Sequence, residues 1–186
     1  MEALIALLVI CGLPLLFVLV QYNSLVALRQ YIRNAWSNID TELKRRHDLI
    51  PNLVATVQGY ADHERETLAA VVELRNRCLA EHDSLGARAE SENALAGAVQ
   101  RLMVVAENYP NLKADQNFRQ LQSELVNTED RIQAARRFYN GNVRDYLTKC
   151  QSFPSNLVAN AFGFQPEEYL SIEPAAREVP TVSLGS

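Results

Sequence analysis

Residues 118–139 read FRQLQSELVNTEDRIQAARRFY, and this stretch decides the fold class. The residues that carry its pattern recur at alternating steps of three and four: Phe118, Leu121, Leu125, Thr128, Ile132, Ala135 and Tyr139. That spacing places them on one face of a long α-helix. The next apolar positions, Val143 and Cys150, drift from the seven-residue repeat, as a straight helix does. The stretch therefore predicts a helix of a compact bundle rather than a long coiled coil.

Three more stretches carry the same alternation. Their seams are Leu25, Leu28, Ile32, Ala35, Ile39 and Leu43; Leu53, Val57, Tyr60, Glu64, Thr67, Val71, Leu74 and Cys78; and Leu95, Ala98, Leu102, Val105 and Tyr109. We expect a kink or restart at Pro51, which lacks an amide donor, and helix ends near 82–86 and at Pro110. No alternating run of β-branched residues predicts a sheet. The predicted class is all-α, with an N-terminal transmembrane helix followed by an antiparallel four-helix bundle with long helices.

The first residues predict the membrane helix. Residues 3–20 read ALIALLVICGLPLLFVLV, an uncharged run that as a helix spans about 27 Å of the roughly 30 Å hydrocarbon core. A cleaved signal peptide would open with Lys or Arg, but only Glu2 precedes the run. A buried core helix, the other alternative, is usually shorter and has a polar face. Because no Gly or Pro separates the run from the first seam, we expect one continuous rod until Pro51.

The charges beside the run predict its orientation. Basic residues follow it and none precedes it: Arg29, Arg33, Lys44, Arg45 and Arg46. By the positive-inside bias, we expect a single-pass membrane protein with its N-terminus outside and its domain in the cytoplasm. An odd count of three cysteines, with Cys11 inside the run, fits a reduced compartment.

Three parts are predicted along the chain. They are a transmembrane anchor at 1–21, a cytoplasmic helical bundle at 22–163 and an extended or disordered tail at 164–186. Ser155 is expected to cap a short helical turn that Gly163 closes. The tail has three prolines and no helical period, and three of its apolar residues could dock on the bundle: Tyr169, Leu170 and Val182.

Motifs for enzymatic chemistry are not found in the sequence. The string HERET at 63–67 begins like a zinc-protease helix, but Thr67 stands where a second histidine ligand is needed. No histidine has a glutamate three residues before it, as a di-iron bundle requires, and the three cysteines are too far apart for a Cys-x-x-Cys zinc site. We therefore expect that the protein is not an enzyme and has no catalytic residue, no cofactor and no metal. A net charge of -4 also argues against nucleic acid as a partner.

Two basic clusters remain as a candidate interaction surface. Its residues are Lys44, Arg45 and Arg46 in one cluster, and Arg136, Arg137, Tyr139 and Asn140 in the other. A solvated helix face is the plainer interpretation of such clusters. A mixed aromatic and basic surface suits a protein partner better than a small substrate. Glu64 and Thr67 occupy seam positions where Leu or Val is expected, so they either pair locally at the end of the bundle or contribute to a ligand site.

Six unbroken strings carry a resemblance to a known family. They are YNSLV at 22–26, AWSNID at 35–40, KRRHDLIPNLV at 44–54, YPNLKA at 109–114, RRFYN at 136–140 and FPSN at 153–156. These strings resemble the LemA family of bacterial membrane proteins, over most of the chain from Tyr22 to Tyr169. Thr41-Glu42 departs from a pair that often reads Val-Gln. The resemblance implies an N-terminal membrane helix, an outward N-terminus, a cytoplasmic four-helix bundle and no agreed biochemical activity.

The leading hypothesis is a membrane-anchored, non-enzymatic adaptor or scaffold at the cytoplasmic face of the bacterial membrane. Family genes often lie beside genes for other membrane proteins, which supports this role by analogy. The expected partners are the lipid bilayer, through the N-terminal helix, and a membrane protein; a homo-oligomer is compatible with the sequence. The alternative is a ligand-responsive sensor or signalling component that binds near Glu64 and Thr67, and a helical enzyme of unrecognised type ranks third.

Overall fold

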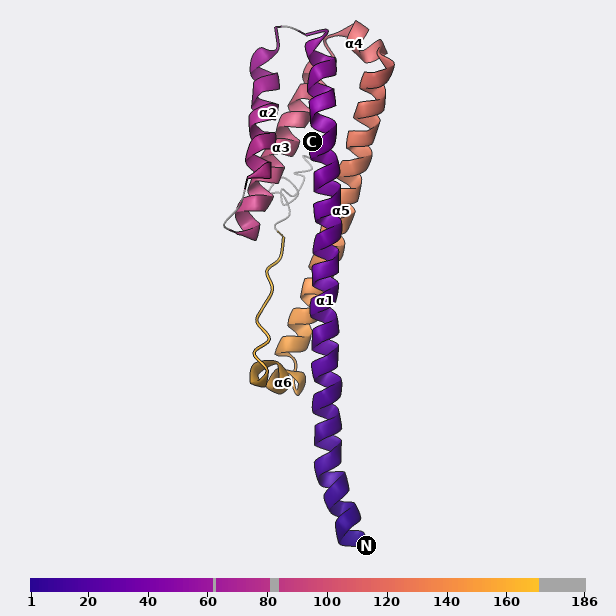
Figure 1. Ribbon diagram of the computed structural model, residues 1–186, viewed down its shortest axis with the longest axis vertical. Coiled ribbons are helices and arrows are strands. Elements are labelled where there is room, and N and C mark those ends of the chain that lie inside the picture. The colour runs from indigo at the N-terminus through magenta and orange to yellow at the C-terminus, as the bar shows by residue number, and fades with distance from the viewer. Residues whose placement is uncertain (62, 81–83, 171–186) are drawn as a thin grey trace, which may run out of the picture. The chain divides into compact units, whose positions relative to one another are not determined.

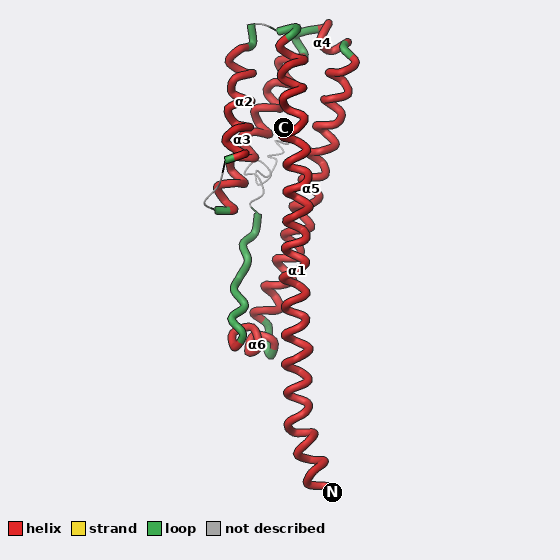
Figure 2. Tube along the Cα trace, viewed as in Figure 1, coloured by secondary structure: helices red, strands yellow, loops and turns green. Residues whose placement is uncertain are grey.

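The computed structural model describes residues 1–61, 63–80 and 84–170, with the side chains of residues 3–11 outside that description. All regular structure within these residues is helical, as Figures 1 and 2 show. The helices are α1 (Glu2–Gln58), α2 (Arg65–Leu79), α3 (Leu85–Ala106), α4 (Pro110–Ala114), α5 (Gln116–Gln151) and α6 (Ser155–Ala161). The predicted all-α class is confirmed. Most of the predicted tail, including Val182, lies outside the described residues.

Helix α1 contains the candidate membrane span. Within Gly12–Gln58, an apolar window of 18 residues is long enough to cross a membrane, and 6% of that window is buried. Five of its large apolar side chains are more than half exposed: Leu13, Leu15, Leu16, Leu19 and Val20. A core helix of a soluble protein buries such residues. Length, composition and exposure therefore agree with the predicted transmembrane helix.

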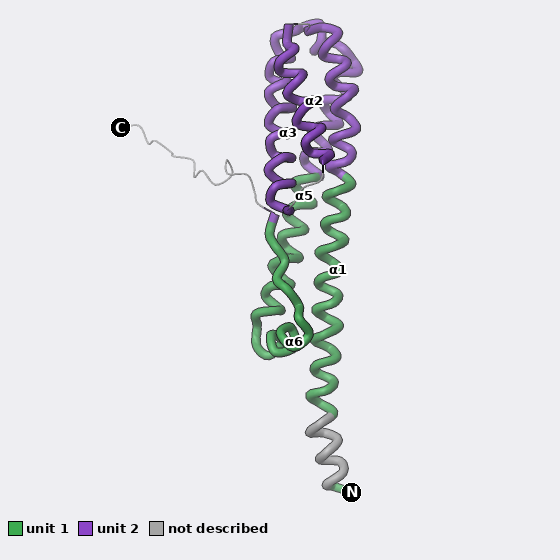
Figure 3. Tube along the Cα trace, turned by 60° about the vertical axis from the view of Figure 1, so that its left-hand side comes forward, with its two compact units in different colours: residues 1–41, 132–169 green, residues 42–131, 170–186 purple. Residues whose placement is uncertain are grey.

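The described chain divides into two compact units, which Figure 3 distinguishes by colour. The first unit comprises residues 1–41 and 132–169, and the second comprises residues 42–131 with Leu170. The core of the second unit is drawn from α1, α2, α3, α4 and α5: Ile50, Leu53, Val57, Ala61, Leu68, Val71, Cys78, Leu95, Ala98, Val99, Leu102, Ala106, Leu112, Phe118 and Leu125. Many of these are the predicted seam residues, and α2 and α3 pack directly against each other.

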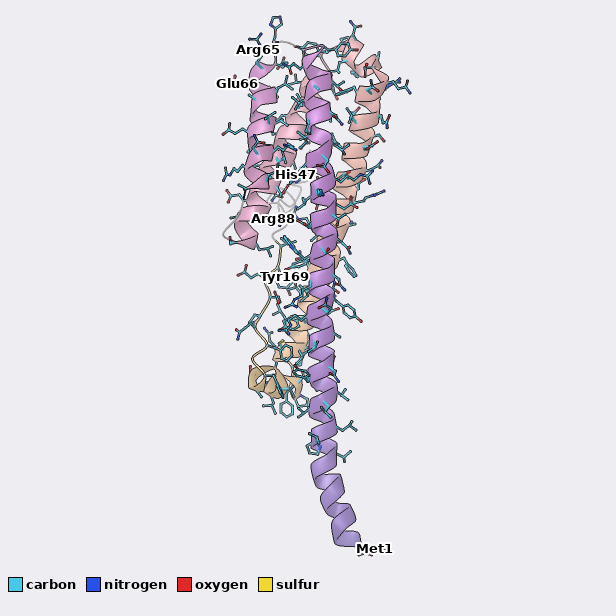
Figure 4. All side chains as sticks on the ribbon, viewed as in Figure 1. Met1, His47, Arg65, Glu66, Arg88 and Tyr169 are labelled. Atoms are coloured by element: carbon cyan, nitrogen blue, oxygen red, sulfur yellow. The ribbon has the colours of Figure 1, made fainter. Side chains whose placement is uncertain are left out.

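The first unit has its own buried residues. They are Leu25, Ile32, Ala35 and Ile39 of α1; Ile132, Tyr139, Val143 and Tyr146 of α5; Val158 and Ala159 of α6; and Phe164. Two tyrosine hydroxyls of α5 hold the extended segment after α6: that of Tyr146 donates to the Gln165 carbonyl at 2.8 Å and that of Tyr139 to the Glu168 carbonyl at 3.1 Å. The beginning of the predicted tail is thus extended and docked, whereas Tyr169, labelled in Figure 4, is exposed.

The predicted restart of the helix at Pro51 is wrong. Helix α1 continues through Pro51 to Gln58, and the chain breaks instead between Gly59 and Glu64. Pro51 has no amide hydrogen to donate to the carbonyl of His47, four residues earlier. In the second unit the guanidinium Nε of Arg75, on α2, donates to that carbonyl at 2.8 Å. Because a side chain from another helix replaces the missing donor, the helix continues.

The predicted role of Ser155 is also wrong, although the turn it was placed in is present. Ser155 is the first residue of α6 rather than its cap, and Pro154 occupies the cap position without a side-chain hydrogen bond. The Ser155 hydroxyl points back and donates to the carbonyls of Lys149 at 2.6 Å and Ser152 at 2.9 Å. Gly163 closes the turn as predicted, with a φ of 67° that favours glycine.

Candidate functional site

The first predicted cluster is not a single surface patch. Lys44 and Arg45 are exposed, but Arg46 is buried, with 4% of its surface accessible. The cause is the helical period, since Arg46 lies three residues after Leu43 and four before Ile50, both of which are core residues. The sequence carried this signal, because the first seam continued by one step reaches position 46. Arg46 is thus a core residue of the second unit.

Arg46 is the centre of a buried ionic cluster with His47 and Glu92. One guanidinium nitrogen, Nη2, donates to the Glu92 carboxylate and also to the Glu92 backbone carbonyl at 3.2 Å. The other, Nη1, donates to Glu129 Oε2 at 2.9 Å. His47, labelled on α1 in Figure 4, places its Nε2 3.1 Å from Glu92 Oε1 and 3.2 Å from Oε2. Three helices of the second unit, α1, α3 and α5, are joined by this cluster.

The cluster sets the ionisation of its members. Burial alone would raise the pKa of Glu92, but the hydrogen bond from His47 and the charge of Arg46 outweigh it, so the pKa is lower than usual. Cys78, on α2, behaves in the opposite way: burial and the nearby Glu92 carboxylate raise its pKa to about 12. At neutral pH the cluster therefore holds a carboxylate, a guanidinium and a protonated thiol.

Three residues of this region carry side chains that can bind a metal ion. The ligand atoms of His47, Cys78 and Glu92 all lie within 4.8 Å of one another, and all three residues are buried. Histidine nitrogen, cysteine sulfur and carboxylate oxygen form a donor set that zinc accepts. Two features oppose it here: the Arg46 guanidinium already binds the carboxylate, and the thiol would have to lose a proton from a raised pKa. The geometry fits a structural ion-pair network better than a metal centre.

The second predicted cluster also separates into different environments. Arg137 is exposed, whereas Arg136 and Asn140 are half-buried on α5 in the first unit. Tyr139 is buried, its ring 5.9 Å from that of Trp36 in an edge-on contact, so it is a core residue and not part of an exposed surface. The exposed aromatic residue is its neighbour Phe138, with 59% of its surface accessible.

The two polar seam residues, Glu64 and Thr67, lie in different environments. Glu64 accepts a hydrogen bond from the Tyr109 hydroxyl at 3.0 Å, which is the local pairing that the sequence left open. That bond, with burial and the charge of Glu64, raises the pKa of Tyr109. Thr67 lines a groove of about 590 Å³ between α2 and α3, together with Val104 and Arg101. A ligand near this end of the second unit would therefore meet Thr67 rather than Glu64.

Comparison with known proteins finds one matching family and several relatives. Residues 35–184 match the model of the LemA family. Magnetosome protein MamQ 2 of Paramagnetospirillum magneticum is 25% identical over 182 aligned positions, which cover 84% of this chain and 67% of the relative. MamQ of Magnetospirillum gryphiswaldense is 24% identical with the same coverage. Protein LemA of Metamycoplasma hominis is 28% identical over 137 positions, covering 74% of this chain and 63% of the relative.

Proposed function

The chain belongs to the LemA family, and we propose that it is a membrane-anchored, non-enzymatic adaptor or scaffold. In this proposal an antiparallel four-helix bundle lies at the cytoplasmic face of the bacterial inner membrane, and the N-terminus lies outside. Likeness to magnetosome proteins supports membrane association. The basic residues after the apolar run, Arg29 and Arg33 among them, support the orientation through the positive-inside bias.

One observation carries the proposal: uncovered apolar residues and fully buried core residues lie on the same unbroken helix. Leu13 and Leu16 of α1 are exposed, whereas Leu25 and Ala35 of α1, in the same unit, are buried. No loop intervenes between these positions. A bilayer that holds the first turns of α1 therefore holds the first unit without a flexible linker. A short, fixed tether suits a protein that presents a surface to neighbours in the membrane.

Each unit has its own proposed partner surface, formed by the exposed basic residues of one predicted cluster. In the second unit, Arg45 pairs with Glu124 at 4.0 Å, and the two side chains are 45% and 35% exposed. An ion pair of this kind contributes little stability and leaves the guanidinium able to exchange partners. In the first unit, Arg137 adjoins the exposed ring of Phe138. Arginine and aromatic residues are enriched where proteins bind one another.

A pull-down from native membranes in mild detergent tests the adaptor role. The informative variant is Arg45→Glu, and Arg131→Glu is its matched control, because Arg131 is also exposed and also holds a weak pair, with Glu42 at 3.8 Å. We expect the wild type and Arg131→Glu to retain the same membrane protein, and Arg45→Glu to lose it. If no specific protein is retained by the wild type, or if both variants retain it equally, the proposed surface is wrong.

The sensor alternative is favoured by the groove at Thr67 and Val104. Val104 is 62% exposed and lines the groove, so Val104→Arg would fill it without disturbing the core. A sensor should show a thermal shift with fractions of a metabolite extract, and Val104→Arg should abolish that shift. Such a result, together with a pull-down that retains no partner, would favour the sensor over the adaptor.

A further inference from the structure

We propose that the α6 patch, defined as Phe153, Leu157 and Phe162, inserts into the headgroup region of the lipid bilayer. This inference rests on the proposed membrane anchor and adds a second contact between the protein and the membrane. The first unit contains the patch, the anchor helix and Tyr22, the α1 residue that contacts Phe162 of the patch. Figures 1 and 3 show α6 beside α1 at the end of α5, and α1 continues beyond α6 toward the N-terminus.

The place where protein begins to cover α1 coincides with the end of the apolar run. Val20, the last residue of the run, is 55% exposed, whereas Leu25 is completely buried. Five residues of helix separate them, which is about 8 Å. The headgroup layer extends some 5 to 8 Å beyond the hydrocarbon on each side. The first packed layer of the domain therefore begins within the headgroup layer or at its edge.

Aromatic contacts fix the α6 region at that depth. The Tyr22 ring lies 5.0 Å from the Phe162 ring and 5.7 Å from the Phe164 ring, both edge-on. Tyr22 follows Val20 by two residues, about 3 Å along the helix. Tyrosine at this position is typical of the aromatic belt that marks a membrane interface. Because Phe162 touches Tyr22, the Phe162 end of the patch lies at the level where the hydrocarbon ends.

The chemistry of the patch suits lipid. Phe153, Leu157 and Phe162 are 80%, 60% and 55% exposed, although single exposed apolar residues elsewhere need no explanation. Here they lie in a stretch, residues 150–166, that contains no Asp, Glu, Lys or Arg. Exposed aromatic and leucine side chains without charge are the features of a segment that lies in the interface plane.

One basic residue adds an electrostatic contribution. The Arg29 guanidinium lies 5.2 Å from the centre of the Phe164 ring, so its positive charge is held beside the uncharged stretch. Arg29 follows the apolar run closely enough on α1 for anionic lipid headgroups to attract its charge. The bilayer is the occupant that the anchor already brings to the patch, which is why lipid is preferred to a second copy of the chain.

Depth-dependent fluorescence quenching in the full-length protein tests the proposal. The chain has one tryptophan, so a Trp36→Phe background removes the native signal. Into this background we would place Phe153→Trp or Phe162→Trp, with Phe138→Trp as the matched control, an exposed aromatic position of the same unit. The probes are bilayers whose lipids carry bromine on the acyl chains near the headgroup. We expect the Phe153 and Phe162 variants to lose most of their emission, and the Phe138 variant to keep it.

A further variant separates this inference from the anchor on which it rests. Leu16→Trp places the probe inside the apolar run, where brominated lipid should quench it if α1 spans the bilayer. Quenching of Leu16→Trp without quenching at both patch positions would overturn the inference and leave the anchor intact. A blue-shifted emission at the patch without quenching would show that protein covers it, which also overturns the inference. If Leu16→Trp is not quenched, the anchor itself is wrong.

Discussion

Replacing Arg46 by methionine should destabilise the second unit severely while leaving its packing volume nearly unchanged. The Arg46 side chain is 5% exposed and its partner Glu92 is 6% exposed, so the variant leaves a carboxylate buried beside His47 and the Cys78 thiol, without a guanidinium. Breaking a buried pair in this way costs about 3–5 kcal/mol. Glu129, the other partner of Arg46, is 38% exposed and can turn to water. The loss should therefore come from Glu92.

Urea denaturation of a chain that begins at Tyr22 measures the effect. With a slope of 1 to 3 kcal/mol per M, the midpoint should fall by roughly 2 M. The control is Arg45→Met on the neighbouring exposed position, which should change stability by less than about 0.5 kcal/mol. Replacing Glu92 by methionine in the Arg46→Met protein should restore most of the loss, because no buried charge then remains.

The pH dependence identifies the cause. In the wild type the pKa of Glu92 is lowered, so its stabilising contribution is present above the unfolded value of about 4.3 and is lost as pH falls through the folded value. Without Arg46, burial should raise the pKa of Glu92, and the loss of stability should then grow as pH rises through that value. The destabilisation should be largest near neutral pH and smaller near pH 5. A loss below about 1 kcal/mol, or one of equal size at both pH values, would refute the reasoning.

Three other perturbations have defined outcomes. Arg75→Met should lower the free energy of unfolding by about 1–3 kcal/mol in urea denaturation, because the His47 carbonyl loses its donor. Adding Pro51→Ala should recover much of this loss, because alanine supplies an amide hydrogen. If the effects of the two substitutions are simply additive, the account of α1 is contradicted. Equimolar zinc should leave the thermal midpoint unchanged, whereas a rise that disappears when the cysteine of the buried cluster is replaced would establish a metal site. Arg29→Glu with Arg33→Glu should disturb membrane insertion in a cell-based topology assay. Charge reversal at the exposed Lys44 and Arg45, about 36 to 38 Å along the helix from Val20, should not. Disturbance by the second pair alone would show that this segment reaches the lipid.

The helical seams could be predicted from the sequence because each depends on local spacing. The pattern from Phe118 to Tyr139 identified α5, and the apolar run identified the candidate span. Where prediction failed, the cause was a contact between distant residues. Pro51 has every local property of a helix breaker, and only Arg75, twenty-four residues away in the sequence and on another helix, makes it acceptable.

The candidate site shows the same limit in a different form. Three adjacent basic residues indicate an exposed patch when they are considered by composition, but the helical period assigns Arg46 to the core and its neighbours to the surface. The seam through Leu43 and Ile50 could have revealed this. Its partner could not have been identified in that way, since the sequence does not say which of 22 acidic residues Arg46 meets. That Glu92 is the partner is a fact of helix packing.

The topology of the protein is the central claim, and protease treatment of intact spheroplasts tests it most directly. The full-length chain would carry epitope tags at both ends. If the domain lies in the cytoplasm, external protease should remove the N-terminal tag and spare the domain, and the domain should be digested only after the membrane is permeabilised. Digestion of the domain in intact spheroplasts, with the N-terminal tag protected, would contradict the account.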